Sequence, residues 1–199
     1  PDLWSDEFAA IEVFNDSDFE KNRTQSVEDW FALLNAGKTY WAVGSSDSHD
    51  QRSTPVGYPR TCMRFGTDDP RQLTQERVRD VLRAGTSTIS GGLYLEVSGP
   101  GGILPGGTSQ PGQYRVKVQS PSWIVPARLE VYVDGVLAQT IEVPEPPATP
   151  GRVWETTVEI AAAQSRPRHW VVFHVAGKGD LDPIHPGRTP FAASNPIFF

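Results

Sequence analysis

The spacing of hydrophobic residues changes near Gly91, and this change constrains the fold more than any other feature of the sequence. Before it, apolar runs typical of strands alternate with segments of helical periodicity. After it, short runs with a period of two residues follow one another, separated by Gly and Pro. We therefore expect a two-part α+β chain: a truncated α/β unit over residues 1–90 and an all-β, immunoglobulin-like sandwich over residues 91–199.

The first part has few strand signals. AIEVF (10–14), YWAVGSS (40–46) and TCMRF (61–65) predict strands, because they are apolar and contain β-branched or aromatic residues. With the helices predicted between and after them, they alternate as in an α/β fold but are too few to close a barrel. The chain also begins at Pro1 without Met. We therefore expect it to be a piece of a longer protein.

Two segments of the first part predict short amphipathic helices. SVEDWFALLNAG (26–37) has apolar residues at helical spacing, with Ser26 as the expected N-cap and Gly37 as the stop. LTQERVRDVLRAG (73–85) repeats the pattern, with Thr74 as the expected cap and a closing glycine.

Six runs of the second part alternate as half-buried strands do. They are LYLEV, YRVKV, LEVYV, LAQTIEV, WETTVEI and HWVVFHV. Asp134 and Gly135 predict a two-residue hairpin turn between two of these runs, because both residues tolerate a positive φ. PEPPATPGR (144–152) predicts a loop or an edge connection, since its prolines cannot donate to a central ladder.

Composition limits the classes of function. A formal net charge of −6 disfavours a general nucleic-acid binder, so we expect no nucleic-acid partner. No apolar run approaches the ~20 residues needed to span a bilayer. Cys62 is the single cysteine, which excludes an internal disulfide, and we expect it to be a buried small hydrophobic residue. The oligomeric state stays open, and so does the compartment, which could be the cytoplasm or outside it.

The stretch GSSDSHD (44–50) carries the strongest chemical signal. Asp47 and His49 are two residues apart, so their side chains share a face if the preceding strand continues through them. A carboxylate and an imidazole suit a divalent transition metal, although a catalytic zinc needs about three protein ligands. The alternative is that Ser45, Ser46 and Asp47 only turn the chain and cap local backbone groups.

The stretches IEVFN, LLNAGKTYWAVGSSDSHD and VGYPRTCM together resemble the end of a PHP (polymerase and histidinol phosphatase) domain. The likeness is to a bacterial subset that includes carbaryl hydrolase-like enzymes. It covers residues 8–90 and extends more weakly into GTSTISGG and SNPIFF. The resemblance implies a distorted seven-stranded β/α barrel with up to three metal ions, whose last motif, Asp-x-His, is matched by Asp47 and His49. The opening His-x-His motif and the middle Glu and His ligands of the family have no counterpart here, so we expect them upstream of Pro1.

The resemblance implies a metal-dependent hydrolase of the phosphoesterase type, acting on a phosphate ester or a related small-molecule ester. Asp47 and His49 are then the expected metal-binding and catalytic residues, with zinc, manganese or iron as the metal. Arg60 is the expected substrate-binding residue, because guanidinium pairs bidentately with phosphate. We expect the 199-residue chain itself to bind metal at most weakly and to be inactive.

Other residues give weaker signals. Arg52 is a second candidate for phosphate, Glu12 could orient the ligands, and Asp50 lies beside the motif. The competing hypothesis is a non-catalytic binding module, in which the β-sandwich recognises a carbohydrate or a protein. Trp123 is the best candidate for an exposed, stacking aromatic residue, whereas we expect Trp170 to lie in the core.

Overall fold

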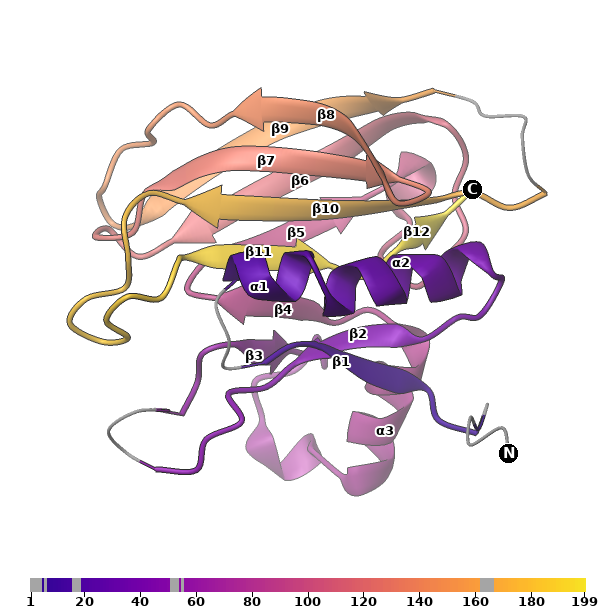
Figure 1. Ribbon diagram of the computed structural model, residues 1–199, viewed down its shortest axis with the longest axis horizontal. Coiled ribbons are helices and arrows are strands. Elements are labelled where there is room, and N and C mark those ends of the chain that lie inside the picture. Colours follow the sequence, from indigo (N-terminus) through magenta and orange to yellow (C-terminus); the bar gives the residue numbers. More distant parts are fainter. Residues whose placement is uncertain (1–4, 6, 16–18, 51–53, 55, 162–166) are drawn as a thin grey trace.

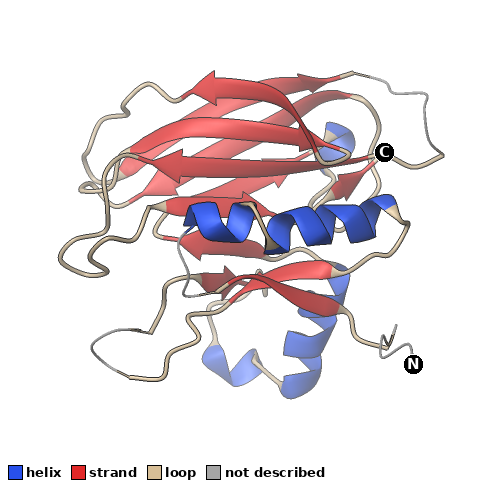
Figure 2. Cartoon of the chain, in the orientation of Figure 1, coloured by secondary structure: helices blue, strands red, loops and turns tan. Residues whose placement is uncertain are grey.

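The computed structural model describes residues 5, 7–15, 19–50, 54, 56–161 and 167–199. Strands predominate over helices (Figure 2). The elements up to residue 91 are β1 (Ala10–Phe14), α1 (Phe19–Arg23), α2 (Ser26–Asn35), β2 (Trp41–Gly44), β3 (Arg60–Cys62), the 3₁₀ helix η1 (Pro70–Gln72), α3 (Gln75–Ala84) and β4 (Thr88–Gly91). Those that follow are β5 (Tyr94–Ser98), the 3₁₀ helix η2 (Pro100–Gly102), β6 (Gly112–Ser120), β7 (Pro126–Val133), β8 (Val136–Glu142), β9 (Arg152–Ile160), β10 (Trp170–Gly177), β11 (Phe191–Ser194) and β12 (Ile197–Phe198).

Within the described residues the strands form three sheets. β1 and β2 pair in parallel, whereas the pairs in the other two sheets are antiparallel. The largest sheet has the order β3-β4-β11-β10-β7-β8, with β12 also paired to β10, and the third sheet has the order β5-β6-β9. The buried rings of Tyr114 (β6) and Phe173 (β10) lie 6.2 Å apart between these two sheets. The two antiparallel sheets therefore stack as in a β-sandwich (Figure 1).

The largest sheet crosses the boundary expected at residues 90 and 91. β3 lies before this boundary and β4 spans it. β4 pairs with β3 on one side and with the C-terminal β11 on the other. Phe14 and Phe191, from opposite ends of the chain, belong to one hydrophobic core, with ring centroids 4.8 Å apart. The periodicity did not reveal this arrangement, because β3 has only three residues and β4 is buried at every position.

Helices α1 and α2 cover the face of the largest sheet opposite to the third sheet (Figure 1). α2 buries residues at helical spacing: Val27, Trp30, Phe31 and Leu34. The ring of Phe31 lies 4.8 Å from that of Trp170 in β10, and Phe19 of α1 stacks on Phe191 of β11 at 4.5 Å. Both faces of the largest sheet are therefore covered, and the prediction that Trp170 lies in the core is confirmed.

The helix ends follow the sequence signals except at one position. Gly37 and Gly85 adopt left-handed φ values of 80° and 69° just beyond α2 and α3, and Thr74 caps α3 by accepting a hydrogen bond at its side chain. The prediction that Ser26 caps α2 is wrong. Ser26 is already the first helical residue, and Gln25 precedes it without a capping hydrogen bond from its side chain.

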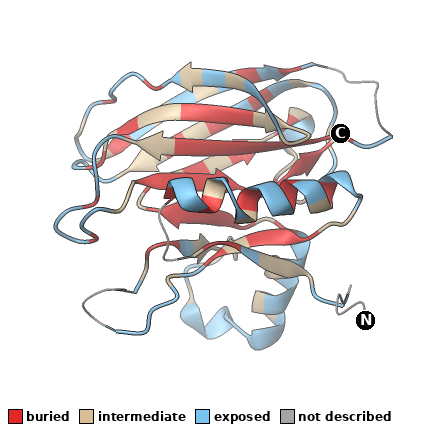
Figure 3. Ribbon diagram, viewed as in Figure 1, coloured by how far each residue is buried: buried red, intermediate tan, exposed pale blue. Residues whose placement is uncertain are grey.

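α3 is peripheral, and none of its residues is fully buried (Figure 3). Its expected apolar stripe is present but only half-buried: Val78, Val81 and Leu82. Among the described residues, no helix has both the length and the apolar character needed to cross a bilayer.

The six predicted β runs of the second part are all found as β5 to β10. Asp134 and Gly135 form the hairpin turn between β7 and β8, with φ values of 50° and 84°, which confirms the predicted turn. Residues 144–151 contain no strand, as their prolines predict. The short elements α1, β11 and β12 were not predicted, because two to five residues carry too little periodicity.

A polar cluster lies between the helices and the largest sheet. Arg23 of α1 donates from Nη2 to Glu130 Oε2 and to the Tyr132 hydroxyl, each at 2.7 Å. His174 of β10 is 1% exposed beside this cluster, and neither of its ring nitrogens has a hydrogen-bond partner among the described residues. Burial, together with the positive charge of Arg23, lowers the pKa of His174 to about 3. This imidazole is therefore neutral in the folded protein at pH 7.

Candidate functional site

The candidate residues Asp47 and His49 lie in the loop that follows β2. The strand ends at Gly44, and Asp47 adopts a left-handed φ of 44°, so the residues of the motif are not extended. The strand does not continue through Asp47 and His49, so their side chains do not share a face of an extended strand. The turn nevertheless brings Asp47 Oδ1 to 3.2 Å from His49 Nε2. Both side chains are exposed, which leaves them open to solvent and to a ligand.

Thr54 forms hydrogen bonds with residues 48–50 of this loop. Its hydroxyl oxygen accepts the backbone N–H of His49 at 2.9 Å and that of Asp50 at 3.3 Å. Ser48 donates from Oγ to the Thr54 carbonyl. The loop is thus closed by hydrogen bonds to backbone groups, as expected of a turn-forming segment. The Asp47 and His49 side chains remain outside these bonds.

The start of the loop is tied to β1. The N–H of Ser45 donates to the Phe14 carbonyl at 3.0 Å, which extends the parallel pairing of β1 and β2 by one step. The Ser45 hydroxyl donates to Glu12 Oε1 on β1. Glu12 therefore lies near the loop but orients Ser45 rather than Asp47 or His49.

The donor types of this pair suit zinc, manganese or iron, but their number does not make a catalytic site. Within the described part of the chain, no three His, Cys, Asp or Glu side chains cluster as a metal site would require. The other histidines are buried elsewhere: His169, His174 and His185 are 4%, 1% and 9% exposed. Asp47 and His49 alone therefore do not fit a complete catalytic metal centre.

Arg60 begins β3, and its side chain is exposed. Its Nη1 donates to the Gly57 carbonyl at 3.0 Å. Arg60 also lines a cavity of about 360 Å³ together with Cys62. We expected Cys62 to be buried, but it is only half-buried. Arg52, the second arginine considered for phosphate, lies outside the described residues.

Trp123 is 52% exposed, in agreement with its selection as the most exposed tryptophan of the β half. It lines a cavity of about 120 Å³ with Arg60, Ile184 and His185. Ile184 is also exposed, at 59%, so an aromatic ring, an aliphatic side chain and a guanidinium meet at one surface depression. Such a combination can stack on and hydrogen-bond to a polar ring.

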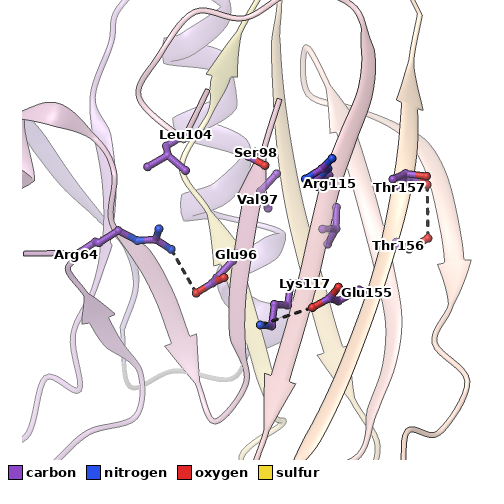
Figure 4. A pocket seen from close by; sticks show the side chains of 11 residues that line it. Arg64, Glu96, Val97, Ser98, Leu104, Arg115, Lys117, Glu155, Thr156 and Thr157 are labelled. Carbon is purple, nitrogen blue, oxygen red and sulfur yellow. Dashed lines mark hydrogen bonds and ion pairs between the residues drawn. The ribbon is translucent and has the colours of Figure 1, made fainter. Parts of the chain in front are cut away.

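A groove over the third sheet was missed by sequence reasoning. It has a volume of about 700 Å³ and lies over β5, β6 and β9, with Arg64 and Leu104 beside it (Figure 4). The alternation in QYRVKVQ indicates that Arg115 and Lys117 face outward, but it does not reveal which residues of neighbouring strands lie beside them.

Comparison with known proteins adds no relative. No family model, curated protein or solved structure matches the chain.

Proposed function

We propose that Asp47 and His49 form the Asp-x-His motif of a PHP-type metal-dependent hydrolase with phosphoesterase-like activity, of which this chain is the C-terminal part. The observation that supports this proposal best is the exposed Asp47–His49 pair, with 3.2 Å between Oδ1 and Nε2. The pair follows β2, at the carboxyl end of the parallel strands β1 and β2. Enzymes with α/β folds commonly build their active sites at this edge.

In this proposal the chain contributes only a share of the metal ligands. A catalytic metal takes about three protein ligands, and the described residues bring two together. The remaining ligands then come from another segment of the parent protein or from a partner chain. When bound, zinc, manganese or iron would supply an activated water for ester hydrolysis. The 199-residue chain by itself is accordingly inactive.

Arg60 is assigned the role of binding the phosphate of the substrate. It is exposed, and no acidic side chain pairs with it among the described residues, so its remaining N–H groups can meet an anion. A guanidinium suits this role because it donates two parallel hydrogen bonds to a phosphate.

The experiment compares variants of a longer chain that includes the upstream segment, with p-nitrophenyl phosphate as the substrate. Asp47→Ala and His49→Ala should each abolish metal-dependent hydrolysis. Asp50→Ala is the matched control, because it removes an exposed carboxylate from the same loop and should retain activity. Undiminished hydrolysis in the Asp47→Ala variant would rule out the assignment.

A second candidate function is carbohydrate binding by the β-sandwich, which the exposure of Trp123 beside Arg60 and Ile184 favours. Aromatic rings at such depressions contribute large contact area and a face on which a sugar can stack. The test is glycan-array binding of the chain. Binding that is lost in Trp123→Ala and kept in the Asp47→Ala, His49→Ala double variant would support this candidate over the hydrolase.

A further inference from the structure

The outer face of the third sheet carries polar side chains that the strand pleat places in rows. Along β6 the buried residues alternate with outward-facing ones, so that Arg115 and Lys117 both point away from the core. The pairing register fixes their neighbours. Lys117 lies opposite Glu96 of β5 and Glu155 of β9.

The next row differs in its chemistry. Arg115 lies opposite Ser98 of β5 and Thr157 of β9, so its neighbours across both strands are hydroxyl groups and not carboxylates. In Figure 4, Arg115 stands between Ser98 and Thr157 on the floor of the groove. All three residues line the groove of about 700 Å³.

The other charges of the groove are paired. Arg64 Nη2 lies 3.3 Å from Glu96 Oε1, and Lys117 Nζ lies 3.6 Å from Glu155 Oε1. The guanidinium of Arg115 has no hydrogen bond or ion pair among the described residues, and Arg115 is exposed. The groove therefore contains one uncompensated positive charge, flanked by two hydroxyl groups.

We propose that Arg115, Ser98 and Thr157 bind an oxyanion, a phosphate or a carboxylate, carried by a small polar ligand. The guanidinium supplies up to five N–H donors in a planar arrangement that matches two oxygens of such a group, and each hydroxyl supplies one donor more. A groove of this volume is within the range of ~300–1,000 Å³ that small-molecule sites occupy. The site uses no residue of the loop that holds Asp47 and His49, so it stands independently of the proposed hydrolase function.

The charge of the surroundings limits the ligand to a small one. Glu96 and Glu155 flank the site in the adjacent row, and the whole chain carries a formal net charge of −6. An extended polyanion such as a nucleic acid needs many cations to neutralise its phosphates, and the groove offers one unpaired cation, whereas a single phosphate or carboxylate contacts the Arg115 row alone.

The experiment is a titration of the ¹⁵N-labelled 199-residue chain, followed by NMR, with three sugars that share the glucose ring and differ in the group at C6. Glucose 6-phosphate tests the phosphate, glucuronate tests the carboxylate, and glucose is the neutral control. We expect one or both charged sugars to shift the amides of β5, β6 and β9 around Arg115, and glucose to leave them unchanged. The charged sugar that binds more tightly shows whether the site prefers a phosphate or a carboxylate.

Arg115→Gln should weaken this binding at least ~10-fold, because it removes the positive charge and the paired N–H donors that the oxyanion would contact. Arg79→Gln, which removes an exposed arginine from α3, is the matched control and should bind as the parent does. The Ser98→Ala, Thr157→Val double variant keeps the charge and should weaken binding less. The proposal is overturned if glucose shifts the same amides equally, if no sugar shifts them, or if Arg115→Gln binds unchanged.

Discussion

The side chain of Asn195 forms hydrogen bonds to both backbone polar groups of Ala42. Its Oδ1 accepts the Ala42 N–H at 2.7 Å, and its Nδ2 donates to the Ala42 carbonyl at 3.1 Å. The same Nδ2 donates to the Ser87 carbonyl at 3.0 Å. Asn195 is completely buried, and its side chain supplies to β2 the hydrogen bonds that a neighbouring strand would otherwise make. It thereby joins the strand that precedes the Asp47–His49 loop to the C-terminal end of the sandwich.

Asn195→Ala should lower the free energy of unfolding by about 2–4 kcal/mol, because it leaves buried N–H and C=O groups without partners. Urea denaturation followed by circular dichroism measures this loss. Gln113→Ala is the control, since it removes an exposed amide from β6 and should change stability by less than ~0.5 kcal/mol. Equal effects of the two substitutions would contradict the role given to Asn195.

Arg23→Met should destabilise the protein by about 1–3 kcal/mol, because the buried Glu130 and the half-buried Tyr132 would lose a charged partner. Glu130 keeps its contact with Arg128 at 2.8 Å, which limits the loss. Arg79→Met breaks an exposed pair with Asp80 and should cost less than ~1 kcal/mol. A smaller effect at Arg23 than at Arg79 would show that the Arg23–Glu130 pair does not hold α1 on the sheet.

The strands β5, β6 and β9 could be predicted because each buries one face and so alternates visibly, whereas β10 is largely apolar and buried at six successive positions. Sequence alone could not give their partners. Arg115 has two neighbours across the sheet, Ser98 on β5 and Thr157 on β9. They come from separate strands, and only the register of the sheet places them beside Arg115. The role of Asn195 could not be predicted from the sequence for the same reason, since its hydrogen bonds to Ala42 join residues that are far apart in the chain.

The sequence could single out Asp47 and His49 as candidates, but it could not give the geometry of the loop that holds them. The residue types and spacing of Asp47 and His49 indicated metal chemistry. The expected common face assumed a strand that continues past Gly44, whereas the left-handed Asp47 brings the two side chains together in a turn. Backbone conformation in such a loop depends on local hydrogen bonds, here those to Thr54, and not on periodicity.

Acid should destabilise the fold through His174. Its pKa is about 3 in the folded protein and near 6.5 when unfolded, so between these values only the unfolded chain takes up the proton. The free energy of unfolding should therefore fall as pH drops from 6.5 towards 3, with a contribution of up to ~1.4 kcal/mol per pH unit. His174→Leu should reduce this slope, and urea denaturation at several pH values measures it. The same slope in both proteins would contradict the assignment.

The measurement that tests the central claim most directly is a Zn²⁺ titration of the chain, followed by NMR of the histidine imidazole nitrogens. The chain has four histidines, and His169, His174 and His185 are buried internal controls. If Asp47 and His49 form an incomplete metal site, His49 alone should shift, binding should be weak and unsaturated at equimolar Zn²⁺, and Asp47→Ala should weaken it further. Tight stoichiometric binding that Asp47→Ala abolishes would show a complete site, and a silent His49 would show none; either result would contradict the account.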